Sequence, residues 1–332
     1  MFLRSSVSFL LLAGFIVAPG TNRMAWADEQ EQGREFKPEF ASTKTAIAKF
    51  KVDFRVAIMA PAKTRKLRVW VPLPPTNKTQ VVRESNFRTF PREHQPRLTR
   101  EPTFGNEFAY FEINAPDGAL EIQHTFIAEI AQSDWGVDYS KVVNAGSWPQ
   151  AFEVFQAPDA RSGRATDYKK IVGQIQSESD QNSQQFMKAI EWVDKHLTYD
   201  SANASLTADP AHGLIHRRGH CSDYHGLCGT FAREIGYPSR VLYGLQMFDK
   251  GSPSHCKLEV CIPPFGWVTY DLSETQKLAL KISKDEKMLP AQRKDLAVFV
   301  RQRTLKGFRE NTWLLVTRGE NYPLAPPASK PV

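Results

Sequence analysis

The run Gly219-His220-Cys221-Ser222-Asp223-Tyr224-His225-Gly226-Leu227-Cys228 places a cysteine where an amphipathic helix is expected to begin. Apolar residues recur at helical spacing as far as Ile235, and Gly236 then provides a stop signal. A helix N-terminus offers partial positive charge and free amide donors, which favour a thiolate over a thiol. Cys221 is therefore predicted to be a thiol nucleophile. Cys228, two turns further along the apolar stripe, is predicted to be a buried, inert thiol.

A histidine and an aspartate follow on two strand-like segments. His255 begins the first segment, whose polar face carries His255, Lys257, Glu259 and Cys261 and is expected to line an open cleft. Asp271 ends the second segment, and a turn at residues 263–266 is predicted to fold the two segments into a hairpin. An imidazole activates a thiol best when a carboxylate fixes its tautomer. The order and spacing therefore predict a triad of Cys221, His255 and Asp271.

The N-terminal half of the chain has the alternation of half-buried strands. Apolar and polar residues alternate from Phe50 to Ile58, and the pattern returns at residues 67–71, 107–113 and 120–130 between turn residues. Residues 44–132 are therefore predicted to form an all-β domain of the sandwich type. Residues 133–170 are irregular and are predicted to connect it to the next domain.

The C-terminal half mixes helical and strand patterns. An apolar stripe predicts a helix that ends near Tyr199, and its members are Phe186, Ile190, Val193 and Leu197. Strands are predicted at residues 240–243, 255–262, 267–271, 296–299 and 313–316. The Lys-rich stretch 277–294 is predicted to be a loop or a short helix. The Pro-rich end, residues 321–332, is predicted to be a frayed tail.

The first 27 residues have the features of a secretory signal peptide. Arg4 precedes an apolar stretch too short to span a bilayer, and the small-residue pattern Ala25-Trp26-Ala27 resembles a cleavage site. The mature chain is therefore expected to start near Asp28, to be exported to the periplasm or beyond, and to hold no integral membrane segment. Cleavage removes two arginines and no acid, so the formal net charge falls from +7 to +5. The remaining basic residues are scattered, which argues against nucleic-acid binding.

Four cysteines lie within one third of the chain. An even number of cysteines in an exported protein suggests disulfides, but a chain of this size can bury a sufficient core without them. One bridge among Cys228, Cys256 and Cys261 is left open, and Cys221 is expected to be free.

Several runs around these residues resemble the transglutaminase-like superfamily, in particular its bacterial exported branch. The core runs that carry the resemblance are Gly219–Tyr224, Arg233–Gly244, His255–Val260 and Gly266–Glu274. The phrase Leu67–Pro74 also resembles the β-domain that precedes the core in that branch. The resemblance implies an α+β fold with a papain-like core at residues 171–320, in which the nucleophile helix packs on an antiparallel sheet.

The resemblance also implies roles for single residues. Cys221 is then the nucleophile, His255 the general base and Asp271 its orienter, in agreement with the roles inferred from the residues alone. Tyr199 is a candidate for assisting the oxyanion site, beside the backbone amide of Cys221. The chain departs from the family at Lys257, where many relatives carry Trp.

The predicted function is that of a thiol-dependent acyltransferase or hydrolase that acts on amide bonds of a peptide or protein. The alternative is a protein of the same fold that binds peptides or scaffolds the envelope without catalysis. The histidines between 212 and 225 are dense enough to suggest a zinc site, but Gly219 interrupts the helix that would hold them together. No nucleotide, flavin or calcium motif is found in the sequence, so no cofactor or metal is predicted. The oligomeric state is left open.

Overall fold

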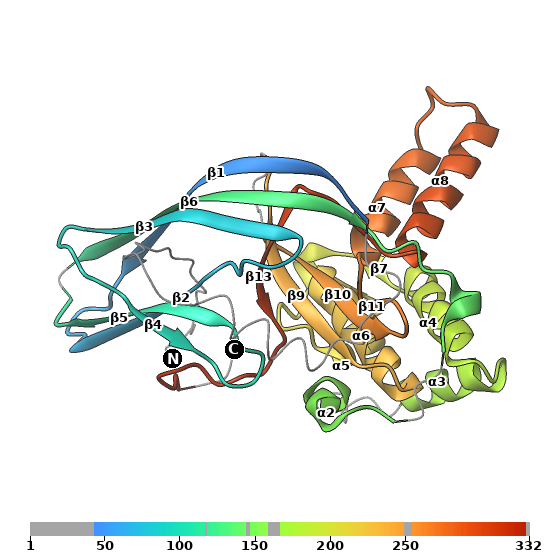
Figure 1. The fold of residues 1–332 in the computed structure, drawn as a ribbon, viewed down its shortest axis with the longest axis horizontal. Helices are drawn as coiled ribbons and strands as arrows, with labels where there is room; N and C mark the ends of the chain where they lie inside the picture. The colour runs from blue at the N-terminus through green and yellow to red at the C-terminus, as the bar shows by residue number, and fades with distance from the viewer. Residues whose placement is uncertain (1–42, 117, 144–146, 159–166, 249–253, 330–332) are drawn as a thin grey trace.

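The N-terminal strands form two facing sheets in the computed structural model, which describes residues 43–116, 118–143, 147–158, 167–248 and 254–329. One sheet has β6 (Ala119–Asp134) between β1 (Thr43–Met59) and β3 (Gln80–Phe90), and the other has β5 (Glu107–Asn114) between β2 (Lys66–Pro72) and β4 (Arg97–Arg100). All of these pairings are antiparallel. Figure 1 shows the two sheets as stacked layers. The prediction of a strand-rich, sandwich-like N-terminal region is confirmed.

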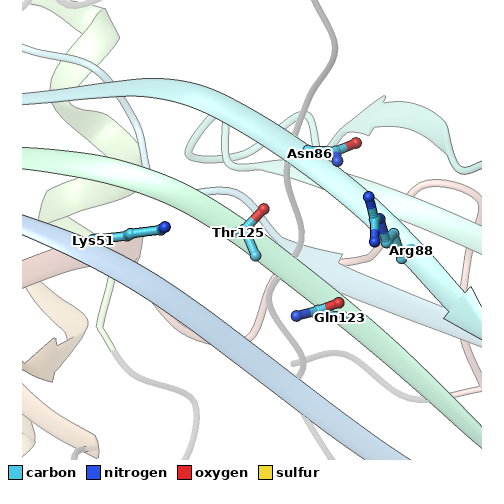
Figure 2. Close-up of a pocket in the computed structure, with 5 residues that line it drawn as sticks. All are labelled: Lys51, Asn86, Arg88, Gln123 and Thr125. Carbon is cyan, nitrogen blue, oxygen red and sulfur yellow. The ribbon is translucent and has the colours of Figure 1, made fainter.

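Alternating residues of the two sheets form the core between the layers. Val69 and Phe111 from one sheet meet Ile122 and Phe126 from the other in a single buried cluster. The outward positions of β6 are only partly buried, which gives the period of two that the sequence shows. A shallow groove lies on the outer face of β1, β6 and β3, and Figure 2 shows the side chains that line it: Lys51, Asn86, Arg88, Gln123 and Thr125.

The second half of the chain packs helices on an antiparallel sheet. The sheet order is β11 (Gly266–Tyr270), β10 (Ser254–Ile262), β9 (Ser239–Gln246) and β13 (Trp313–Arg318). Helix α6 (Cys221–Ile235) contacts β9 and β10, and α3 (Asp167–Ser177) and α4 (Asn182–His196) contact α6. The helix at residues 221–235 ends as predicted, at Gly236 in the left-handed region with φ of 107°.

Short elements complete this half. They are η1 (Tyr139–Lys141), η2 (Gln150–Phe152), α2 (Glu153–Gln156), β7 (Thr198–Tyr199), η4 (Ser201–Asn203), α5 (Pro210–His216), β8 (Arg218–Gly219) and β12 (Phe308–Arg309). The strands β7 and β8 pair in parallel, which sets Tyr199 beside Gly219 at the start of α6. Within the described residues, no helix is both long and apolar enough to cross a membrane.

The last strands join the two halves. β12 pairs with β6 of the N-terminal sheet, while β13 pairs with β9 of the second sheet. Leu314 and Val316 of β13 belong to the sandwich core. The buried amide of Gln80 binds the backbone of Leu315 at both ends: its Nε2 donates to the carbonyl at 2.9 Å, and its Oε1 accepts from the N–H at 2.8 Å. The sheet that carries His255 is therefore anchored on the β-sandwich.

Three C-terminal segments differ from their predictions. Residues 296–299 lie in the helix α8 (Pro290–Leu305) and not in a strand. Residues 277–294, predicted to be a loop or a short helix, comprise the end of a second long helix, α7 (Leu272–Ser283), the connection at 284–289 and the start of α8. Periodicity cannot separate a short apolar run in a strand from one in a helix. Here Ala297 and Val300, three residues apart, face Ala279 and Ile282 of α7 in a buried cluster. The tail is not frayed along its length, since Tyr322 and Leu324 are buried against Phe108. The predicted signal peptide lies outside the described residues.

Candidate active site

The first turn of α6 is built around Asp223. His220 precedes the helix, and its backbone N–H donates to Asp223 Oδ2 at 2.8 Å. The same carboxylate accepts the hydroxyl of Ser205. A Cβ atom at Gly219 would lie 2.7 Å from Cβ of Asp223, so only glycine fits there. These contacts fix the start of the helix and leave Cys221 as its first residue.

The sulfur of Cys221 lies among several polar side chains. His220 Nδ1 and Cys256 Sγ are each 3.0 Å from Cys221 Sγ. Burial alone raises the pKa of the Cys221 thiol, but hydrogen bonds from Cys256, His220 and His255 and the positive charge of His255 outweigh it and hold that pKa well below its usual range. The thiol is therefore poised to be a thiolate at neutral pH.

The sheet register brings His255 and Asp271 together. Leu258 of β10 pairs with Tyr270 of β11, so Asp271 leaves the sheet one residue further on, beside the start of β10. His255 Nε2 lies 2.7 Å from Asp271 Oδ2, and its Nδ1 lies 3.9 Å from Glu274 Oε1. Burial lowers the pKa of His255, but the charge of Asp271 and hydrogen bonds to Asp271 and Cys221 raise it to about 9. Asp271 and His255 are thus in direct contact, and His255 and Cys221 are near enough for each to shift the pKa of the other.

Lys257 is a buried cation that contacts the carboxylate of Asp271. Its ammonium lies 2.5 Å from Asp271 Oδ2 and 2.9 Å from Glu310 Oε1, and its side chain is fully buried. Burial lowers the pKa of Lys257, but the charges of Asp271 and Glu310 raise it above the usual value. This pairing changes the interpretation of the polar face of β10. Lys257 is not part of an open cleft wall but a buried cation that neutralises two carboxylates, and Glu259 is likewise buried, in an ion pair with Arg240.

His225 is a further buried imidazole beside the site. It lies one turn after Cys221 on α6, and its Nε2 accepts the backbone N–H of Leu272 at 3.1 Å. Burial lowers the pKa of His225 to about 4, so the ring is neutral and Nδ1 carries its proton. Sequence analysis considered His225 only as a zinc ligand. Its i,i+4 spacing from Cys221 was the signal that it faces the same side of the helix.

All four cysteines are free thiols. The disulfide left open among Cys228, Cys256 and Cys261 is not formed, because each packs in a different buried cluster. Burial raises the pKa values of Cys228 and Cys256. Among the thiols of Cys221, Cys228 and Cys256, only that of Cys221 has a lowered pKa, and Cys256 is its neutral hydrogen-bond donor.

Tyr199 lies on the same side of α6 as the sulfur. Its ring centroid is 5.7 Å from that of His220, and the ammonium of Lys277 is 4.2 Å from it. Burial raises the pKa of Tyr199, and the neighbouring charge of Cys221 adds to this effect, so the hydroxyl stays protonated. A protonated hydroxyl can donate a hydrogen bond.

Access to the sulfur is restricted. Cys221 has an exposed fraction of 0% and His255 of 3%, so the open cleft expected from the sequence is not present at the sulfur. Half-buried His220, Tyr199 and Tyr243 lie around the sulfur. An acyl substrate therefore needs side chains of this kind to move aside before it reaches the thiolate.

No group of three or more His, Cys, Asp or Glu side chains is placed to hold a metal ion in the part of the chain that the structure describes. The rings of His212 and His216 lie side by side on α5 at a tilt, but the left-handed Arg217 turns the chain before His220.

Replacing Lys257 with Met is expected to lower the free energy of unfolding by about 3 kcal/mol, because two carboxylates then share a site without their common cation. The charge of Lys257 also lowers the pKa of His255, so its loss moves the alkaline limb of any reaction that needs the imidazolium to higher pH. Urea unfolding and a pH profile measure the two effects. Glu310→Gln is the matched control with a smaller expected loss, since the side chain of Glu310 is 31% exposed. Equal stability of the two variants would contradict this role.

The comparisons with known proteins concern the same region. Residues 169–272 match the family model described as the Transglutaminase-like superfamily. The fold is similar to that of a protein from Cytophaga hutchinsonii solved as a candidate cysteine protease, with a TM-score of 0.57 and 12% identity over 88% of this chain and 87% of that one. The periplasmic domain of TgpA from Pseudomonas aeruginosa aligns with a TM-score of 0.39 and 13% identity over 77% of this chain and 80% of that one. A search of curated proteins found no match. The family match and the fold of the Cytophaga protein confirm the α+β, papain-like fold class.

Proposed function

We propose, from the membership of residues 169–272 in the transglutaminase-like superfamily, that this chain is an exported cysteine acyltransferase or amide hydrolase. Its substrate is an amide bond of a peptide or protein, and its intermediate is a thioester on Cys221. One observation carries the proposal. Hydrogen bonds from Cys256, His220 and His255 and the charge of His255 lower the pKa of the Cys221 thiol, and the imidazole of His255 is hydrogen-bonded to Asp271 at 2.7 Å.

The first half of the reaction forms the thioester. The thiolate of Cys221 attacks the carbonyl carbon of the amide, and the negative charge moves to the carbonyl oxygen. The backbone N–H of Cys221, at the helix start, and the hydroxyl of Tyr199 are the candidate donors to that oxygen. The C–N bond then breaks as Nδ1 of His255 gives its proton to the departing nitrogen, while Asp271 holds Nε2. The amine leaves and the acyl group stays on sulfur.

The second half releases the acyl group. His255, now neutral, removes a proton from water or from a second amine, which attacks the thioester carbon. The C–S bond breaks and the thiolate returns. Water gives hydrolysis, and an amine gives transamidation. The closed surroundings of the sulfur favour transfer to an amine that excludes water as it binds.

A non-catalytic peptide-binding protein of the same fold is the competing function. It has no need for a thiol with a lowered pKa or for an imidazole aligned by a buried carboxylate. Both features bury charge, which costs stability. A protein that only binds peptides gains nothing in return for that cost. The proposal of catalysis therefore fits the arrangement better.

Trapping the acyl-enzyme tests the proposal. The protein from Asp28 onward is mixed with a library of peptide amides, quenched in acid and digested, and a mass increase is expected on the peptide that holds Cys221. Cys221→Ser is expected to abolish this adduct, while Cys228→Ser, the matched control, is expected to keep it. Adding a primary amine such as cadaverine separates transfer from hydrolysis. Failure of every peptide to acylate a folded protein would favour the binding function.

The site of action is proposed to lie outside the cytoplasm. The support is the signal-peptide pattern of residues 1–27. The partner is then an exported peptide or protein, which the envelope provides.

A further inference from the structure

The helices α7 and α8 form a hairpin that projects from the rest of the molecule, as Figure 1 shows. Their seam is a small buried cluster of Ala279, Ile282, Ala297 and Val300. The base of the hairpin is tied to the body through Gln276, which accepts the hydroxyl of Tyr224, and through Arg301, which pairs with Asp194. Among the described residues, no side-chain hydrogen bond or ion pair joins residues 278–299 to any part of the chain outside the hairpin.

The outer part of the hairpin leaves large apolar side chains in water. Leu289 is 66% exposed and Phe299 is 56% exposed, and Leu296 lies between them. Leu296 and Phe299 lie three residues apart on one flank of α8, beside the buried face that holds Ala297 and Val300, and Leu289 is the N-cap residue just before the first turn. Leu278, Leu280 and Val298 add further exposed apolar surface. Scattered exposed Leu residues are ordinary, but a row of them on a projecting element marks an interaction surface.

The hairpin is also the basic part of the chain. Residues 272–305 contain eight Lys and Arg against four Asp and Glu, a net charge of +4, while the whole sequence has +7. About a tenth of the chain thus carries more than half of the net charge. Lys281, Lys284, Lys287 and Lys294 form no ion pair with any described residue. Their ammonium groups are available to an outside anion.

We propose that the α7–α8 hairpin docks this protein on the surface of an anionic phospholipid bilayer. Leu289, Leu296 and Phe299 enter the boundary between headgroups and acyl chains, and the flanking lysines meet the lipid phosphates. A second copy of the chain is a less suitable partner for this surface, since two hairpins that each carry a net charge of +4 would repel each other at a two-fold interface. A nucleic acid would use the lysines and leave the apolar row in water.

Docking would also set the position of the candidate active site. Helix α7 begins directly after Asp271, whose carboxylate accepts the N–H of Glu274 as the helix cap. The site therefore lies at the base of the hairpin, on the side of the molecule that faces the lipid. The docking does not depend on the proposed reaction, and either can fail without the other.

Vesicle sedimentation tests the docking. The protein from Asp28 onward is spun with sucrose-loaded vesicles of phosphatidylglycerol and phosphatidylethanolamine, and separately with vesicles of phosphatidylcholine. The wild type is expected to partition at least about tenfold more strongly into the anionic vesicles, and salt should weaken the binding. The double variant Leu289→Glu/Phe299→Glu is expected to lose at least about tenfold of this binding.

The matched control is Ile47→Glu/Phe90→Glu, which makes the same chemical change at two exposed sites of the β-sandwich, 72% and 70% exposed. It is expected to bind like the wild type. Circular dichroism verifies the fold of both double variants, and alkylation of Cys221 at an unchanged rate shows that the site is intact. The proposal is overturned if the wild type ignores anionic vesicles, or if both double variants lose binding equally, which would reflect net charge alone.

Discussion

A His255→Ala variant is expected to alkylate Cys221 with iodoacetamide at pH 7 several-fold more slowly than the wild type, because the thiolate loses the charge and the hydrogen bond of His255 while the hydrogen bonds from Cys256 and His220 remain. In the wild type the imidazolium of His255 lowers the pKa of Cys221 by charge and by hydrogen bonding. Acylation by a peptide is expected to fall further, by about 10³ or more, since the departing amine also loses its proton donor.

The matched control for this variant is His216→Ala, which removes an exposed imidazole from α5. It is expected to leave both rates unchanged. Intact-mass spectrometry over time measures alkylation, and tryptic mapping assigns it to Cys221. An unchanged rate in a folded His255→Ala protein would remove His255 from the proposed site.

An Asp271→Asn variant is expected to reduce acylation by about 10³ to 10⁴, because an amide can donate to the imidazole where the carboxylate only accepts. Nε2 of His255 then loses the acceptor that fixes its proton, and the imidazolium loses its counter-charge. The pKa of His255 is expected to fall from about 9 toward its ordinary value. Since the imidazolium exists only below its pKa, the alkaline limb of activity should move from near pH 9 to lower pH.

A measurement of stability separates the expected loss of acylation from unfolding of the Asp271→Asn variant. Asn also caps helices well, so α7 is expected to form in the variant. Lys257 keeps Glu310 as an ion-pair partner, which limits the loss of stability in the variant. Asp53→Asn, on the exposed face of the β-sandwich, is the control and should leave the pH profile in place. An alkaline limb that stays near pH 9 in a folded Asp271→Asn protein would contradict the role of Asp271.

Much of the fold could be predicted because burial follows the periods of strand and helix. The alternation at residues 50–58 became β1, and the stripe from Phe186 to Leu197 became α4. β3 was missed since its sequence, QVVRESNFRTF, carries charged and polar residues on its outer face and a bulge between Arg83 and Asn86. The α7–α8 hairpin was missed because its buried seam is narrow and most of its apolar residues lie in water.

The residues of the candidate site likewise fall into those that local sequence patterns predicted and those that depend on tertiary packing. The spacing of Cys221, His255 and Asp271 predicted their meeting, because a helix start and a β-hairpin fix each position locally. Glu310 could not be found in this way, since it reaches Lys257 only when the loop between β12 and β13 folds back on the sheet. The contact of Cys256 with Cys221 was also missed, because it depends on how closely α6 packs against β10.

The pH dependence of wild-type Cys221 alkylation tests the central claim most directly. A thiol pKa well below the usual range means that the thiolate is already formed at pH 5, so the rate with iodoacetamide should change by less than about threefold between pH 5 and pH 8. A rate that climbs about tenfold for each pH unit over this interval would show an ordinary thiol, and it would contradict the activated nucleophile on which the proposed chemistry depends.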